Sequence, residues 1–415
     1  MATIKPFRGV RPAREYAKYV AALPYDVMNS AEARVAATGN PHSFLRVDKA
    51  EIDLLDDAPD IDVYDDRVYE KAGENLRKMI ADGILRQDEP PMFYIYSLAA
   101  GGRTQTGVVA CTPVDEYLDG TIKKHELTLE HKERDRIRHM EACDAHTGPI
   151  FMTYRAQSRV DELIGAWMDG HSPEYDFVSE DGVGHKVWLL PEPEIMADLQ
   201  SLFRQVPCLY IADGHHRNAA AAKVRQKRRE SAHRGEPGAE YNYYLAVLFP
   251  HDQVRIMAYN RMVKDLNGLS VEKWLNKAGE KFHISPGADG NPPAVHSFGM
   301  YLAGGWHLLR PKDGLIPNDP IGALDVSILQ NELLGPVLGI DDPRTSPRVD
   351  FAGGARGPAE LERRVNSGEM AVAFAMYPTS LDELFAAADA GKIMPPKSTW
   401  FEPKLRSGLF IHLLD

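Results

Sequence analysis

In the stretch LYIADGHHRNAAAA, residues 209–222, a pattern typical of a strand is followed by one typical of a helix. Its first four residues form an apolar run typical of a buried strand, and its four alanines favour a helix. Asp213-Gly214 interrupts both patterns, so the sequence predicts a strand, a turn and a helix in succession. A helix start presents backbone N–H groups and the positive end of the helix dipole, which suits an anion. We therefore expect a phosphate-binding turn formed by Asp213, Gly214, His215, His216 and Arg217.

The residue types in this turn suit a bound phosphate. Gly214 lets the backbone approach a ligand closely, and the guanidinium of Arg217 can bind phosphate oxygens in pairs. The alternative is that Asp213 only caps the helix and that the two histidines are structural. Zinc binding would require a third ligand, and the chain has no HExxH motif; the candidate third ligands are His125, His131, His139 and His146. We expect no metal site built from these histidines.

A charged segment elsewhere in the chain offers a catalytic base. A helix is expected over residues 128–143, and His125-Glu126 comes just before it. The carboxylate of Glu126 could accept a hydroxyl proton during phosphoryl transfer. We therefore expect three catalytic residues, which are Glu126, His125 and His216.

Two further places are candidates for substrate binding. Asp135-Arg136 lies within the charged helix and could contact a substrate or the helix of the phosphate turn. The alternative there is a solvated face with ion pairs such as Glu130–Arg134. Near the C-terminus two prolines stiffen the loop 395–399, which presents Lys397 and Ser398. A rigid loop without a ligand is the alternative for that segment.

The order of the expected elements favours a mixed α+β fold, with several hairpins and peripheral helices, over a doubly wound parallel sheet. Gly-Gly pairs predict one hairpin from residues 92–99 and 104–113 and another from 300–302 and 306–310. Further expected elements are a hairpin from 241–249 and 253–258, a strand over 44–47 and a helix over 63–82. We expect three regions: 1–90, 91–265 with the phosphate turn, and 266–415.

Composition and charge restrict the partners of the chain. Its 415 residues carry a formal net charge of −12, which argues against nonspecific nucleic-acid binding because that requires basic surface. The three cysteines are widely spaced and form no CxxC motif, so a disulfide framework is not expected. The sequence has neither an apolar signal segment nor a run long enough to span a bilayer. We expect a cytoplasmic protein that binds a small-molecule substrate, with neither nucleic acid nor membrane as partner; the oligomeric state stays open.

Several segments together resemble the family called domain of unknown function 1015. These segments run over nearly the whole chain and include Pro6-Phe7-Arg8-Gly9, Pro24-Tyr25-Asp26-Val27, Gly148-Pro149-Ile150-Phe151, Ala212 to Arg217, and Pro403-Lys404 with Gly408-Leu409. Within that family, the Asp213–Arg217 segment is similar to the signature of the ParB/sulfiredoxin-like superfamily. The resemblance implies a ParB/sulfiredoxin-like core with a nucleotide or phosphate turn at a helix start.

The resemblance also narrows the chemistry. The superfamily includes CTP-binding partition proteins, sulfiredoxins that use ATP, and kinases of free serine. Sulfiredoxins carry a reactive cysteine inside the turn, whereas this chain has histidine there and Cys208 on the preceding strand. We therefore expect a kinase of a small hydroxyl-bearing metabolite such as free serine, with ATP or polyphosphate as donor and Mg²⁺ as cofactor. The alternative is a non-catalytic nucleotide-binding regulatory protein.

Overall fold

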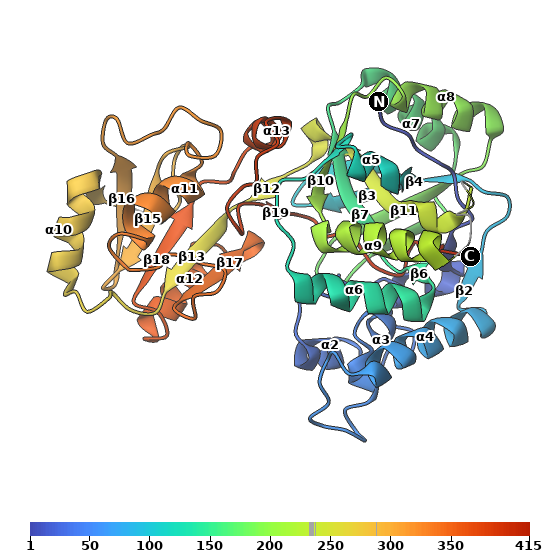
Figure 1. The fold of residues 1–415 in the computed structure, drawn as a ribbon, viewed down its shortest axis with the longest axis horizontal. Helices are drawn as coiled ribbons and strands as arrows, with labels where there is room; N and C mark the ends of the chain where they lie inside the picture. Colours follow the sequence, from blue (N-terminus) through green and yellow to red (C-terminus); the bar gives the residue numbers. More distant parts are fainter. Residues whose placement is uncertain (232–235, 237, 288) are drawn as a thin grey trace. The chain divides into compact units, whose positions relative to one another are not determined.

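The computed structural model describes residues 1–231, 236, 238–287 and 289–415 (Figure 1). They divide into two compact units. The first contains residues 1–123, 128–254 and 403–415, and the second contains residues 124–127 and 255–402. The C-terminal segment therefore belongs to the same unit as the N-terminus. Among the described residues, no helix combines the length and the apolar character that crossing a bilayer requires.

The first unit is built on an eight-stranded mixed sheet. Its strand order is β5 (Ile122–Lys123), β10 (Leu209–Asp213), β7 (Ile150–Tyr154), β11 (Tyr243–Pro250), β4 (Arg103–Pro113), β3 (Phe93–Ala100), β9 (Gly184–Leu190) and β8 (Tyr175–Val178). The β10–β5 and β11–β7 pairs are parallel, and the other pairs are antiparallel. The predicted hairpin of β3 and β4 is confirmed, with Ala100 opposite Arg103. Gly101 and Gly102 both have positive φ, as a tight hairpin turn requires.

Helices cover this sheet and bury its apolar residues. The helices α6 (Glu130–Cys143) and α9 (His215–Ser231) pack together, and α4 (Asp66–Ala81) packs on α6 (Figure 1). The approach of α4 to α6 depends on Gly73, since a Cβ there would lie 2.4 Å from the Ala142 carbonyl oxygen. The core on the sheet is formed by apolar residues of both strands and helices, among them Met140, Ile211 and Ala220.

The second unit has its own six-stranded antiparallel sheet. Its order is β14 (Phe282–Pro286), β16 (Gly305–Pro311), β15 (Phe298–Leu302), β18 (Val372–Met376), β13 (Tyr259–Val263) and β17 (Val349–Gly353). The predicted hairpin of residues 300–302 and 306–310 is confirmed as β15 and β16. The helix α12 (Gly357–Asn366) packs on this sheet and contributes the fully buried Leu361.

Two expected elements are wrong. Residues 44–47 are not a strand, because α3 (Leu45–Asp48) is a single helical turn that buries Leu45 and Val47. Four residues are too few to distinguish the period of a strand from that of a helix. Residues 253–258 do not return along β11, because a 3₁₀ turn at His251–Gln253 ends that strand. The chain then enters β12 (Ile256–Met257), which pairs with β19 (Trp400–Phe401) in the second unit. The mixed α+β class with hairpins and peripheral helices is confirmed.

Candidate functional site

The predicted strand–turn–helix junction is present in the first unit. The strand β10 ends at Asp213, and α9 begins at His215. Gly214 between them has φ of +97°, a conformation that side chains other than glycine rarely adopt. The first hydrogen bond of the helix runs from Asn218 N to Gly214 O at 3.0 Å. The N–H groups of residues 215–217 therefore precede the hydrogen-bond ladder of the helix and lie at the positive end of its dipole.

Asp213 is held as a carboxylate at the start of this turn. Its Oδ1 accepts from Gly214 N at 2.9 Å, and its Oδ2 accepts from the Lys404 ammonium at 2.6 Å. Burial alone would raise the pKa of Asp213, but the charge and hydrogen bond of Lys404, together with His215 and the Gly214 N–H, hold the pKa below its ordinary value. The C-terminal segment thus places a second cation, Lys404, at the turn.

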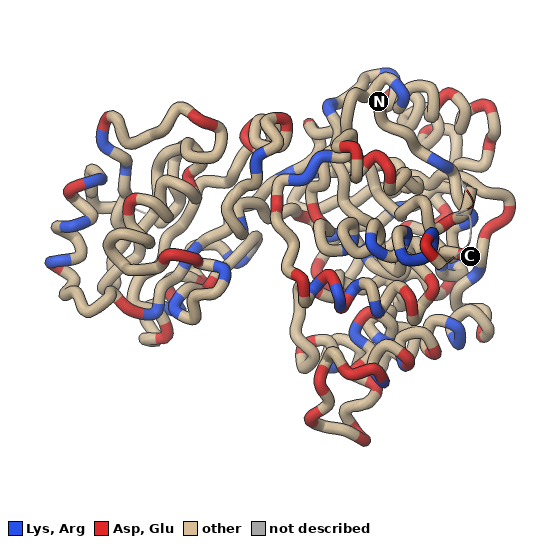
Figure 2. Tube along the Cα trace, in the orientation of Figure 1, with Lys and Arg blue, Asp and Glu red and all other residues tan. Residues whose placement is uncertain are grey.

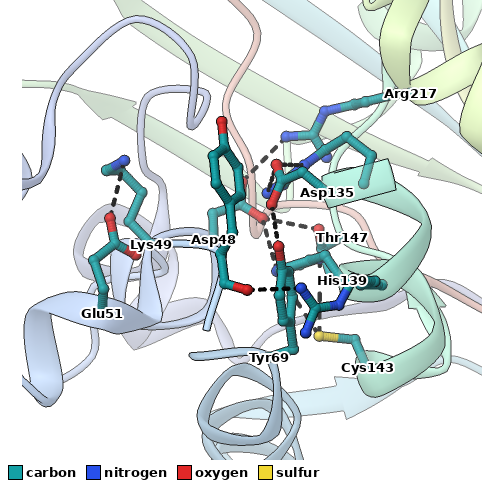
Figure 3. Close-up of polar contacts among 12 residues, drawn as sticks. Asp48, Lys49, Glu51, Tyr69, Asp135, His139, Cys143, Thr147 and Arg217 are labelled. Carbon is teal, nitrogen blue, oxygen red and sulfur yellow. Dashed lines mark hydrogen bonds and ion pairs between the residues drawn. The ribbon is translucent and has the colours of Figure 1, made fainter. Parts of the chain in front are cut away.

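Arg217 points from the first turn of α9 into a buried polar network. Its Nη2 lies 3.2 Å from Oδ2 of Asp48, whose side chain is fully buried. Asp48 Oδ1 also accepts from the Thr147 hydroxyl at 2.8 Å (Figure 3). Burial would raise the pKa of Asp48, but the positive charges around it, led by Arg217, lower it. The guanidinium of Arg217 is therefore fixed by an ionised partner 169 positions earlier in the chain.

A glycine before β7 gives the Arg217 side chain its room. A Cβ at Gly148 would lie 3.0 Å from Arg217 Nη1 and 2.9 Å from the Ser407 hydroxyl. Both distances are shorter than ordinary van der Waals contact, so a larger residue at position 148 would displace the guanidinium. The loop before β7 therefore positions a residue of the turn.

Asp135 and Arg136, predicted to bind substrate, form a buried pair on α6. Arg136 donates to Asp135 Oδ2 through Nε at 2.8 Å, and its Nη2 lies 2.7 Å from the same oxygen. The Tyr69 hydroxyl donates to Asp135 Oδ1 at 2.8 Å. The ring of Tyr25 lies 3.8 Å from the Arg136 guanidinium and 5.1 Å from that of Arg217. Tyr25 thus connects this pair to the phosphate turn.

His139 lies one turn further along α6 and points toward Asp48 (Figure 3). Its Nε2 lies 3.0 Å from the Val47 carbonyl oxygen. A carbonyl oxygen can only accept a hydrogen bond, so the Nε2 of His139 carries a hydrogen and donates it. Burial, together with the charge of Arg136, lowers the pKa of His139 to about 4. The ring is therefore neutral near pH 7 and serves as a donor rather than as a third cation.

The structure divides the other predicted residues between the two units. In the first, the Nε2 of His216 accepts from Leu129 N at 3.1 Å, and His215 is buried. In the second, His125 Nε2 lies 3.2 Å from the Thr399 hydroxyl, and the Ser398 hydroxyl donates to Pro395 O at 2.6 Å. The remaining two predicted residues, Glu126 and Lys397, also belong to the second unit.

Sequence reasoning did not single out four residues that support the turn: Tyr25, Asp48, Thr147 and Lys404. For Asp48 the sequence offers no signal, since it sits in an unremarkable LRVD segment. Tyr25 and Lys404 do lie in segments that carry the family resemblance. Their roles follow only from contacts with residues more than a hundred positions away.

Taken together, the fold and the site define a two-unit α+β protein with a candidate anion-binding turn at a strand–helix junction. The family model described as "Protein of unknown function (DUF1015)" matches residues 4–327. The chain belongs to this family. Among the curated proteins, none matches the chain.

Solved structures with a similar arrangement are distant. A conserved hypothetical protein from Pyrococcus furiosus has 12% identity and a TM-score of 0.36, and the match covers 74% of this chain and 95% of that one. A free serine kinase in complex with AMP has 13% identity and a TM-score of 0.36, with 73% and 92% covered. A C-terminally truncated SbnI from Staphylococcus aureus has 13% identity and a TM-score of 0.40, with 74% and 87% covered.

Proposed function

We propose that the chain is a phosphoryl-transfer enzyme, a kinase of a small hydroxyl-bearing metabolite such as free serine. The observation that carries the proposal is the Asp213–Arg217 turn, in which Gly214 opens a helix start flanked by Lys404 and by the fixed guanidinium of Arg217. Backbone N–H groups, a helix dipole and an arginine at one place suit the phosphates of a nucleotide or polyphosphate donor.

In the proposed reaction the donor's terminal phosphoryl group moves to the acceptor hydroxyl. The hydroxyl oxygen forms a bond to phosphorus while the bond from phosphorus to the bridging oxygen breaks, and the shortened donor leaves with that oxygen. The hydroxyl proton passes to the carboxylate of Glu126, which remains the proposed base on the sequence argument. Donors at the turn would stabilise the negative charge on the transferred group.

Mg²⁺ is part of this proposal as the ion that accompanies the donor. It keeps several waters and commonly binds through one or two carboxylates together with substrate phosphates. Asp213 fits that role, because each of its oxygens accepts one described hydrogen bond and can accept another. Its side chain is also 37% exposed, so an ion can reach it.

One observation favours a second candidate, a nucleotide-binding regulatory protein without catalysis. Glu126 belongs to the second unit, whereas the turn belongs to the first, so binding at the turn does not itself depend on the proposed base. A regulator would bind the nucleotide and transfer nothing.

Phosphate transfer separates the two candidates. We would incubate the protein with Mg²⁺ and ATP, ADP, pyrophosphate or polyphosphate, add serine or another small hydroxyl compound, and follow phosphorus by NMR. The kinase proposal predicts a phosphate ester with at least one donor. It also predicts that Glu126→Gln lowers turnover by roughly 10²–10⁴-fold while donor affinity is unchanged.

Glu130→Gln is the matched control, because Glu130 is an exposed carboxylate on α6 that pairs with Arg134. Its turnover should equal that of the wild type. Tight donor binding without transfer to any acceptor would favour the regulatory protein. Equal turnover in Glu126→Gln and the wild type would remove Glu126 as the base.

A further inference from the structure

A pocket of about 160 Å³ lies in the first unit, next to the network that fixes Arg217. Its walls come from the segment around Tyr25, from the residues at the end of α3 and just after it, and from α4 and α6. Six of the lining residues matter here: Tyr25, Asp48, Lys49, Tyr69, Asp135 and Arg136. At roughly 30 Å³ for each water, the space equals that of about five waters, which suits a molecule of only a few carbon atoms.

Arg136 retains unused hydrogen-bonding capacity at the wall of this pocket. Its side chain is only 6% exposed, and its Nε and Nη2 are both directed to Asp135. Its Nη1 is buried and has no hydrogen-bond partner among the described residues. Buried polar atoms in native proteins are almost always hydrogen-bonded, so this exception requires an explanation. A guanidinium with free N–H groups in its plane is suited to a carboxylate.

Several of the other charged groups that line the wall already have charged or polar partners. Asp48 accepts from Thr147 and from Arg217. The Nζ of Lys49 lies 3.1 Å from Oε1 of Glu51. This pair is drawn in Figure 3. Asp135 accepts from Tyr69 as well as from Arg136. Asp26 and Lys132 line the wall as well, but among the described residues Arg136 is the charged lining residue whose buried nitrogen, Nη1, has no hydrogen-bond partner.

We infer that this pocket binds a small molecule bearing a carboxylate, with Arg136 as the donor to that carboxylate. The ring of Tyr25 lies over the guanidinium at 3.8 Å, so the ligand meets Arg136 in the plane of its N–H groups rather than on that face. Because Tyr25 and Asp48 also contact Arg217, the pocket adjoins the phosphate turn. This inference deepens the proposed function. Only one part of it rests on that function, which is that the bound carboxylate is the acceptor of the phosphoryl group.

Calorimetric titration of the full chain tests this assignment. The probes are L-serine and D-glycerate, which carry a carboxylate, ethanolamine, which lacks it, and inorganic phosphate. The carboxylates should bind the wild type, and ethanolamine and phosphate should not bind in this pocket. Arg136→Gln should weaken carboxylate binding by about tenfold or more, the loss expected for a charge-assisted hydrogen bond. Arg134→Gln is the matched control on the exposed part of the same helix and should bind as the wild type.

A second variant guards against misfolding of Arg136→Gln. Val63 lines the pocket and is 39% exposed, so Val63→Trp can fill space there without entering the core. It should weaken carboxylate binding while the thermal midpoint stays near that of the wild type. Carboxylate affinity that is unchanged in both variants, binding of phosphate instead of carboxylates, or no carboxylate binding to the wild type would each overturn the inference.

The same variants separate this inference from the kinase proposal. If the carboxylates bind through Arg136 but no donor is consumed, the pocket assignment stands and the kinase proposal fails. If phosphate is transferred to serine and Arg136→Gln leaves the KM for serine unchanged, the kinase proposal stands and the pocket assignment fails. ADP affinity, measured in parallel, reports the phosphate turn and should fall less in Arg136→Gln than the affinity for the carboxylates does.

Discussion

At the scale of single residues, the turn depends on charged groups that each have a partner of opposite sign. Arg217 with Asp48 and Arg136 with Asp135 are buried pairs, and the partly exposed Asp213 has Lys404. Breaking one of the two buried pairs leaves an uncompensated charge in the interior, which costs about 3–5 kcal/mol. The pairs therefore fix the positions of the donors that a phosphate would meet.

The buried, neutral His139 predicts a dependence of stability on pH. In the unfolded chain a histidine takes up a proton below a pH of about 6.5. In the folded protein the pKa is lowered to about 4, chiefly by burial. The contribution of the neutral His139 to the free energy of unfolding is therefore fully present above pH ~6.5 and is lost as pH falls toward ~4. Over that window it amounts to about 3 kcal/mol.

Urea unfolding at several pH values measures this effect. His139→Gln should lose a part of the dependence between pH ~6.5 and ~4, since it removes one of the groups that the unfolded state protonates. The buried His146, His185 and His412, whose pKa values are also lowered, account for a further part that this variant keeps. His131→Gln is the control, because His131 is exposed on the same helix. A slope that is unchanged in His139→Gln would show that other groups cause the acid sensitivity.

At the scale of elements, the junction of β10 and α9 is the part of the site that the sequence predicts best. An apolar run, Asp-Gly and four alanines are neighbours in the chain, and each has a local preference that agrees with the structure. Asp48 could not be predicted in the same way, because its partners Thr147 and Arg217 are 99 and 169 positions away. The strand predicted over residues 44–47 is wrong, because four residues are too few to distinguish the period of a strand from that of a helix.

Gly214 tests the junction as an element. A Cβ there would lie 3.5 Å from Ile150, an ordinary contact, so the effect of Gly214→Ala comes from its φ of +97°. We expect a loss of about 1–2 kcal/mol in the free energy of unfolding, together with weaker phosphate binding. Gly165→Ala in α7 (Ser158–Gly170) is the control with the opposite sign, because an open helical position should gain about 0.5–1 kcal/mol. Equal stability of the two variants would contradict the role of the turn conformation.

At the scale of the whole molecule, acidic and basic residues are mixed along the chain, as Figure 2 shows, while the net charge is −12. The mixed α+β class and both Gly-Gly hairpins could be predicted because their signals are local. The return of residues 403–415 to the first unit could not, since their pairings with residues near positions 10, 22 and 146 depend on contacts across the chain.

Two units with separate sheets and cores predict two unfolding transitions in calorimetry. Leu199 and Leu361 are both fully buried, one in the core of each unit. Leu199→Ala and Leu361→Ala should each destabilise by about 2–5 kcal/mol, and each should shift mainly one transition. A single transition that both variants shift equally would show that the two units unfold together.

The most direct test of the phosphate-binding turn is calorimetric titration of ATP, ADP, pyrophosphate and polyphosphate into the wild type and Arg217→Lys. Lysine keeps a positive charge for Asp48 but loses the planar pair of donors, so folding should be retained while phosphate binding weakens. We predict that at least one of these ligands binds the wild type and binds Arg217→Lys about tenfold more weakly. Equal affinity in the two proteins, or no binding of any of these ligands to the wild type, would contradict a phosphate site at Asp213–Arg217.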